Sequence, residues 1–104
     1  WGRLTWLAGG AIGNSEGLTL GRVLIKVGEQ NPRHMHPNSE ELLYLIEGQL
    51  EHTLGDEMVA MGPGDTITIP AGVYHNARST GDSDADMIVA YDTADRKIVF
   101  EDAN

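Results

Sequence analysis

Apolar and polar side chains alternate along the chain in pieces that are too short for typical helices. The stretch LTLGRVLIKV, residues 18–27, places Val23, Ile25 and Val27 on one face and two basic residues on the other. Because successive side chains of a strand point to opposite faces, this period of two predicts a half-buried β-strand. The pattern therefore favours a sheet with one face towards a core.

Seven more pieces with strand character follow, and turns rich in glycine, proline and aspartate separate them. They span residues 41–48, 49–54, 58–61, 66–70, 74–79, 86–92 and 97–101. Many short strands at regular spacing are typical of an all-β sandwich or barrel. No internal repeat or interdomain linker interrupts the series, so we expect a single domain over residues 1–104.

Two loops contain residue types that occur in ligand sites. Residues 80–86, TGDSDAD, hold three aspartates at alternate positions but lack the distal glutamate of an EF-hand, so we expect a solvated turn. Residues 8–14, AGGAIGN, lack the spacing of a phosphate-binding glycine loop, and we interpret them as a flexible loop.

Composition narrows the function classes. The chain has 104 residues, 40% of them hydrophobic, which is enough for one buried core. Seven basic residues stand against sixteen acidic ones, and the net charge of −9 repels nucleic acids and anionic membranes. The longest apolar run, residues 42–46, is far too short to span a bilayer and no secretion leader is recognised, so we expect a cytoplasmic protein.

The segment HMHPNSEELLYLIEG, residues 34–48, is the main candidate for chemistry. Residues two apart on a strand share a face, so His34 and His36 can direct their rings at one point. Glu40 and Glu41 point to opposite sides, so only one of them can join the histidines, and the period alone does not choose. Since the chain has no cysteine, nitrogen and oxygen ligands must hold any metal.

A second segment, GDTITIPAGVYHNARS, brings in another histidine after a proline–glycine turn. Together the two segments resemble the cupin superfamily, whose motifs read G-x5-H-x-H-x3,4-E-x6-G and G-x5-P-x-G-x2-H-x3-N. The motifs fall at residues 28–48 and 64–79, and the final glycine of the first selects Glu41 over Glu40. Ser79 stands where the family has an asparagine that is not a metal ligand. The matching positions are Gly28, His34, His36, Glu41, Gly48, Gly64, Pro70, Gly72 and His75.

The resemblance implies a single jelly-roll barrel, also called a double-stranded β-helix, with a metal inside one end. Its ligands would be His34, His36, Glu41 and His75, and the ion would be one divalent transition metal: Fe, Mn, Ni, Cu or Zn. Similar cupins include dioxygenases of the quercetinase and acireductone type, oxalate oxidases and decarboxylases, sugar isomerases and sugar-binding modules. The fold itself selects none of these activities.

Three neutral imidazoles and one carboxylate leave a divalent ion with a net charge near +1. Open positions on an octahedral ion would suit an enolate-like oxygen beside dioxygen. We therefore expect a metal-dependent enzyme of the dioxygenase type that acts on a small enolisable or organic-acid substrate. By resemblance, Glu41 would also accept a proton from the substrate. The alternatives are a non-redox isomerase, lyase or decarboxylase, or a sugar-like binding module without turnover.

His52 shares a strand face with Leu50 and Leu54, where the alternation requires an apolar side chain. One interpretation is a buried histidine that is hydrogen-bonded to a backbone carbonyl, and the other is a catalytic base in the cavity. The methionines of this region are expected to pack inside the barrel, namely Met35, Met58 and Met61.

Leu42, Tyr44 and Ile46 share the strand face that points away from Glu41, and this apolar face needs a cover. A second copy of the chain in a homodimer would supply one. The alternative cover is the apolar N-terminal segment, residues 1–6.

Overall fold

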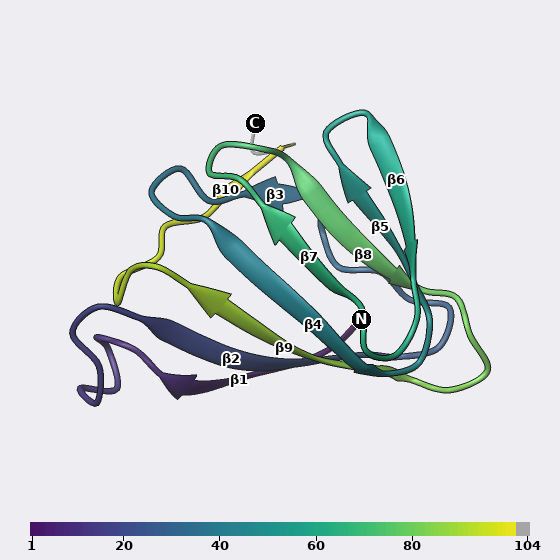
Figure 1. Ribbon diagram of the computed structural model, residues 1–104, viewed down its shortest axis with the longest axis horizontal. Helices are drawn as coiled ribbons and strands as arrows, with labels where there is room; N and C mark the ends of the chain where they lie inside the picture. The colour runs from purple at the N-terminus through teal and green to yellow at the C-terminus, as the bar shows by residue number, and fades with distance from the viewer. Residues whose placement is uncertain (102–104) are drawn as a thin grey trace.

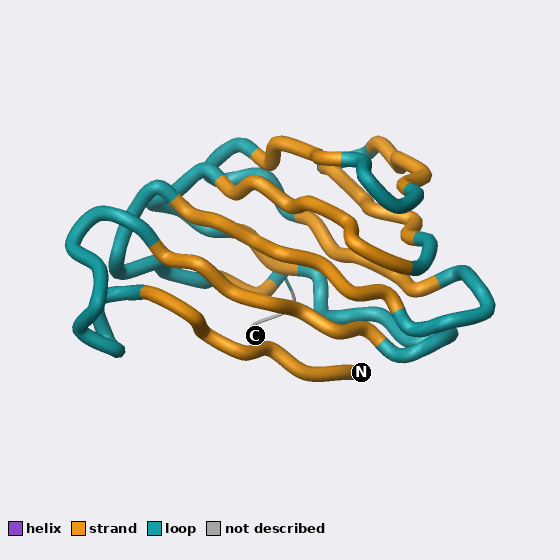
Figure 2. The backbone as a smooth tube through the Cα atoms, turned by 60° about the horizontal axis from the view of Figure 1, so that its bottom comes forward, coloured by secondary structure: helices purple, strands orange, loops and turns teal. Residues whose placement is uncertain are grey.

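The computed structural model describes residues 1–101, which form ten β-strands and no helix (Figure 2). In chain order the strands are β1 (Gly2–Ala8), β2 (Thr19–Ile25), β3 (His34–Met35), β4 (Glu41–Glu47), β5 (Leu50–Leu54), β6 (Glu57–Met61), β7 (Thr66–Ile69), β8 (His75–Ser79), β9 (Ala85–Tyr91) and β10 (Val99–Phe100). Every stretch predicted as a strand overlaps one of the ten, and the all-β class is confirmed. Nothing in this part of the chain is a helix of the length and apolarity needed to cross a bilayer.

The strands form two five-stranded antiparallel sheets that face each other (Figure 1). The first sheet has the order β1-β2-β9-β4-β7 and the second has the order β10-β3-β8-β5-β6. Most neighbours in a sheet are distant in sequence: Leu20 of β2 pairs with Ala90 of β9, which in turn pairs with Leu42 of β4. These crossing connections make the sandwich a jelly roll, as expected.

The core lies between the sheets because the strands turn alternate apolar side chains inwards. On β4, Leu43 and Leu45 are at most 3% exposed, whereas Leu42 and Tyr44 are 46% and 45% exposed. Full burial of a leucine-sized side chain contributes about 1.5–3 kcal/mol. A slip by one residue would turn every one of these side chains to the wrong face, so the alternation determines the register of β4.

Two apolar side chains that were expected inside lie at the surface. Val27 is 48% exposed because β2 ends at Ile25 and the chain turns at Gly28, which has a φ of +80°. Met58 is 63% exposed because it lies on β6, an edge strand of the second sheet, whereas Met61 on the same strand is buried as predicted.

The N-terminal residues form a strand that the sequence pattern did not predict. β1 adds to the edge of the first sheet, where Leu4 pairs with Val23 and Trp6 pairs with Gly21. Directly paired residues share a face, so both side chains point towards the interior side of the sheet. Because β2 and β9 lie between β1 and β4, the N-terminal segment does not cover the outer face of β4 in the same chain, and that alternative is wrong within one copy.

Candidate metal centre

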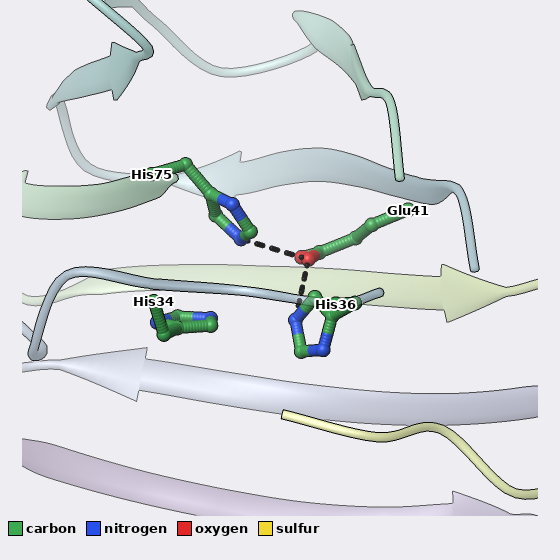
Figure 3. Close-up of side chains that lie close together, drawn as sticks. All are labelled: His34, His36, Glu41 and His75. Carbon is green, nitrogen blue, oxygen red and sulfur yellow. Dashed lines mark hydrogen bonds and ion pairs between the residues drawn. The ribbon is translucent and has the colours of Figure 1, made fainter. Parts of the chain in front are cut away.

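The two sheets bring one cluster of side chains together at one end of the sandwich. His34 of β3 pairs directly with His75 of β8, and His36 follows β3 on the same side. Glu41 is the first residue of β4 and therefore reaches the cluster from the opposite sheet. All four side chains are buried, and Figure 3 shows the Glu41 carboxylate directed between the rings of His75 and His36.

Backbone carbonyls orient the three imidazole rings. The Nδ1 atom of each ring lies within 2.7–2.9 Å of a carbonyl oxygen. The acceptors are Pro32 for His34, Lys97 for His36 and Val73 for His75. Because a carbonyl can only accept, Nδ1 donates the proton and Nε2 keeps its lone pair. This is how histidine ligands are oriented in metal sites.

The Nε2 atoms and the carboxylate then converge. Oε1 of Glu41 lies 3.2 Å from Nε2 of His75 and 3.3 Å from Nε2 of His36. One possible ligand atom from each of these two histidines, from Glu41 and from His34 can be chosen so that all four lie within 4.8 Å of one another. Ligand atoms that share one ion at about 2 Å lie roughly 3–4 Å apart, so the cluster has the dimensions of a slightly relaxed coordination shell.

A cation resolves an electrostatic conflict in this cluster. In its absence, the short contact between Glu41 and His75 requires a proton on Nε2, although Val73 already accepts the Nδ1 proton. Nε2 of His36 is buried and makes no hydrogen bond within the described residues. Lone pairs that face one another in a buried site are costly without a positive charge between them. The residues therefore fit a divalent metal ion.

The charge states favour the same conclusion. Burial lowers the pKa of His34 to about 4, so this ring is neutral at pH 7 and its nitrogen is available as a ligand. Burial alone would raise the pKa of Glu41, but the neighbouring rings of His36 and His75 outweigh it and lower the pKa to about 2. The site thus combines ionised carboxylate and neutral imidazole, the forms that bind metal.

A cavity of about 260 Å³ adjoins the cluster. His34, Glu41 and His75 line it together with apolar side chains. The apolar residues Val23, Ile25 and Leu43 line it, whereas Leu45 belongs to the packed core and does not.

His52 lies in the same cavity wall and is 1% exposed. Its ring stacks on His75, with centroids 5.7 Å apart and planes at 12°. Burial lowers its pKa to about 4. Within the described residues its Nδ1 atom has no hydrogen-bond partner, whereas a backbone hydrogen bond with Thr53 acts on the pKa of the ring in the opposite direction to burial. The interpretation of a histidine held by a backbone carbonyl therefore stays a prediction.

Sequence reasoning missed several aromatic and cationic groups at this end of the molecule. Tyr91 is 6% exposed, its ring centroid lies 4.9 Å from that of His36, and burial followed by the charge of Glu41 raises its pKa. Its place on the inner face of β9 follows from alternation with Val89, but its contact with His36 does not. Phe100 and Arg96 also line the cavity, and no local pattern marks them.

Two glycines adopt backbone conformations that other residues rarely take, one beside the cluster and one at the far end of β4. Gly72 has a φ of +80°, and its N–H group donates to the carbonyl of His36 at 2.9 Å, which ties the β7–β8 turn to a candidate ligand. Gly48 has a φ of +90°, and a Cβ atom there would lie 2.7 Å from Cα of Ala85. Both positions disfavour ordinary side chains, Gly72 for its positive φ alone and Gly48 for steric reasons as well.

Comparison with known proteins places these features in a family. Residues 21–91 match the Cupin domain family. The chain is 41% identical over 83 residues to 5-nitrosalicylic acid 1,2-dioxygenase of Bradyrhizobium sp., which covers 80% of this chain and 40% of that protein. It is 28% identical over 95 residues to oxalate oxidase GF-2.8 of Triticum aestivum, covering 84% and 42% respectively. The chain thus spans less than half the length of these curated relatives.

Solved structures give the same result for the fold. A recombinant oxalate oxidase in complex with glycolate superimposes with a TM-score of 0.86 at 26% identity, over 95% of this chain and 54% of that one. An oxalate decarboxylase of Lactobacillus farciminis in a formate complex superimposes with a TM-score of 0.88 at 18% identity, over 96% and 31%. The second likeness concerns the fold alone.

Proposed function

The chain belongs to the cupin family, and on that basis we propose that it is a metal-dependent enzyme of the dioxygenase type that acts on a small enolisable or organic-acid substrate. The observation that carries the proposal is the convergence of three oriented Nε2 atoms and one carboxylate beside a cavity. The relatives named for dioxygenase and oxidase activity support this direction. Those activities belong to the relatives, and oxygen chemistry in this chain is our proposal.

In this proposal His34, His36, Glu41 and His75 hold one divalent metal ion. When bound, the ion would act as a Lewis acid and offer positions to an oxygen ligand and to dioxygen. Imidazole suits Fe, Ni, Cu and Zn, while the carboxylate also permits Mn, so the donor set does not identify the metal.

The residues around the ion would prepare the substrate. Glu41, an ionised carboxylate, is proposed to accept a proton from the substrate carbon next to the metal-binding oxygen. His52 is proposed to hydrogen-bond to the bound substrate, because its side chain lines the cavity. The apolar side chains of Val23 and Leu43 would exclude water and strengthen these interactions.

Elemental analysis and oxygen consumption test the proposal. Protein purified without chelator should contain about one transition metal per chain. Iron-, manganese-, nickel- and copper-loaded protein is then assayed with flavonols, enediols, diketones and small organic acids, in air and under argon. Turnover that needs oxygen supports the dioxygenase reading. Equal turnover under argon would instead identify a non-redox isomerase, lyase or decarboxylase, and tight binding without turnover would identify a binding module.

We also propose that two copies of the chain associate through the outer face of β4. Leu42 and Tyr44 are almost half exposed there, and no other strand of the described chain covers them. Exposed apolar faces of this kind mark association surfaces. Sedimentation at micromolar concentration should show a dimer that Tyr44→Asp dissociates. A monomeric wild-type protein contradicts the proposal.

A further inference from the structure

Arg96 is a cation in the wall of the metal-site cavity. Its side chain is partly buried, and its guanidinium carbon lies 4.3 Å from the centroid of the Trp6 ring and 5.4 Å from that of the Tyr91 ring. Within residues 1–101 it forms no ion pair and no hydrogen bond through its side chain. A buried or half-buried charge normally has a partner, so this arginine requires an explanation.

Comparison with the other arginines of the chain shows that the lack of an ion pair at Arg96 is unusual. The sequence has sixteen acidic residues available as partners. Three arginines form ion pairs with them, namely Arg22 with Asp86, Arg33 with Glu101 and Arg78 with Glu51. Arg3 is exposed and is solvated by water. Within residues 1–101, Arg96 is therefore the arginine that lines the metal-site cavity and forms no ion pair, and it also lines a second cavity together with Trp6 and Asp95.

The aromatic contacts hold the guanidinium without satisfying its hydrogen bonds. Rings attract a cation through their faces, at about 0.5–2 kcal/mol per contact. The five N–H donors lie in the plane of the guanidinium and form a fork that matches a carboxylate. Trp6 and Tyr91 thus fix where Arg96 lies and leave its donors free for a ligand.

Tyr91 connects this arginine to the metal centre. Its ring centroid is 5.4 Å from the Arg96 guanidinium and 4.9 Å from the centroid of the His36 ring. The cavity wall therefore contains two kinds of polar group, the candidate metal ligands and Arg96, and both lie close to the ring of Tyr91. Apolar side chains such as Met87 and Val89 line the space as well. A ligand that fits must be polar at both ends and apolar between them.

We propose that Arg96 is a specificity-determining residue that binds a carboxylate of the substrate at the end of the cavity away from the metal ligands. The inference rests on the proposed function and names its substrate class. The substrate is a small carboxylic acid with an apolar body whose metal-binding oxygens lie opposite the carboxylate. The volume of about 260 Å³ limits it to roughly the size of one substituted ring.

Two matched probes test this inference without turnover. Catechol and 3,4-dihydroxybenzoate present the same adjacent oxygens to a metal, and only the second has a carboxylate on the other side of its ring. Calorimetry on zinc-loaded protein under argon should show that wild type binds 3,4-dihydroxybenzoate about tenfold or more tightly than catechol, as a charge-assisted fork predicts. Arg96→Gln should remove the preference by weakening 3,4-dihydroxybenzoate alone. Arg96→Lys should keep part of it, because the charge remains.

Arg78→Gln is the matched control, because Arg78 is exposed and lies outside the cavity. It should keep the wild-type preference. If Arg96 only supports the fold, Arg96→Gln will weaken both probes equally or lower the metal content, and the inference is overturned. A wild-type protein that binds both probes equally overturns it too.

Failure of the proposed function is recognised separately. If wild-type protein takes up no metal or binds no catechol, the proposal of a metal-dependent enzyme is disproved. Benzoate binding to metal-free protein then tests whether Arg96 binds a carboxylate. Benzoate binding that Arg96→Gln abolishes supports the arginine site. Binding that the variant retains, or no binding to wild type, refutes it.

Discussion

The two ends of the sandwich interior differ in what fills them, although the same strands build both. On β4, Leu45 lies in the packed end, where Leu50 and Met61 are at most 3% exposed. Four residues earlier on the same strand, Glu41 lies among the histidines and beside a cavity. One alternating pattern thus supplies a closed apolar core at one end and a polar, partly open site at the other.

This difference separates stability from function. The packed end gains free energy from apolar burial and contains no group that a ligand can reach. At the site end, backbone carbonyls hold the buried imidazoles, and in the proposed function a metal ion satisfies their remaining lone pairs. Such sites cost stability in the absence of the ligand. Substitutions at the two ends should therefore have different consequences, which four experiments can measure.

The largest effect is expected on metal content. Glu41→Gln and His36→Ala should each lower it from about one ion per chain to nearly zero, because each removes a ligand from the buried cluster. Both variants should still fold, since the apolar core at the other end remains. Elemental analysis and circular dichroism check this.

Glu40→Gln is the matched control, because Glu40 is exposed on the other face of the chain. It should keep the ion. Normal metal content in the Glu41 and His36 variants would show that the ligands are assigned wrongly.

The next effect concerns core packing. Leu45→Ala should lower the free energy of unfolding by about 2–5 kcal/mol, because it leaves a sealed cavity in the packed end. Leu43→Ala should cost less, since Leu43 already borders the open cavity and its removal creates no new sealed space. Urea denaturation of both variants gives the comparison. Equal losses would mean that the two ends are packed equally well.

The third effect is a pH dependence of the metal-free protein. His34 and His52 both have a folded-state pKa of about 4, below the ordinary 6.5. As the pH falls from 6.5 towards 4, the unfolded chain binds protons that the folded chain does not, so stability decreases. The urea midpoint should fall over this range. His52→Leu should reduce the decrease, and an unchanged pH profile in that variant would contradict the assignment.

The smallest effect compares two glycines. Gly48→Ala should lower the free energy of unfolding by roughly 1–3 kcal/mol, because it combines a positive φ with a contact of 2.7 Å to Ala85. Gly72→Ala should cost about 1–2 kcal/mol, since its φ is also positive but no atom lies within 4 Å of the added Cβ. Thermal unfolding ranks the two. A larger loss for Gly72 would show that the turn beside His36 is less tolerant than its open space indicates.

Much of the candidate site could be predicted because its residues lie in short, regular segments. Spacing by two brings His34 and His36 to one face, and the cupin motif distinguished Glu41 from Glu40. The structure places Glu41 at 4% exposure and Glu40 at the surface. The alternation of β4 and β9 likewise identified most of the inner face. The predictions of burial that failed concerned Val27 and Met58. Val27 lies beyond the end of a strand, and Met58 lies on an edge strand that has only one neighbour.

The sequence by itself determined the all-β class and the turns, because each depends on residues within a few positions of one another. The candidate donor set came from the two cupin motifs, since His75 lies 34 positions after Glu41. Tertiary structure alone decided that Glu41 of the first sheet meets the histidines of the second. It also decided that Tyr91 lies against His36 and that Arg96, whose guanidinium lies over the Trp6 ring, lines the cavity. These contacts join residues that are 50 or more positions apart or that lie on different sheets. Local periodicity specifies which face of a strand is apolar, but it contains no information on which strand becomes its neighbour.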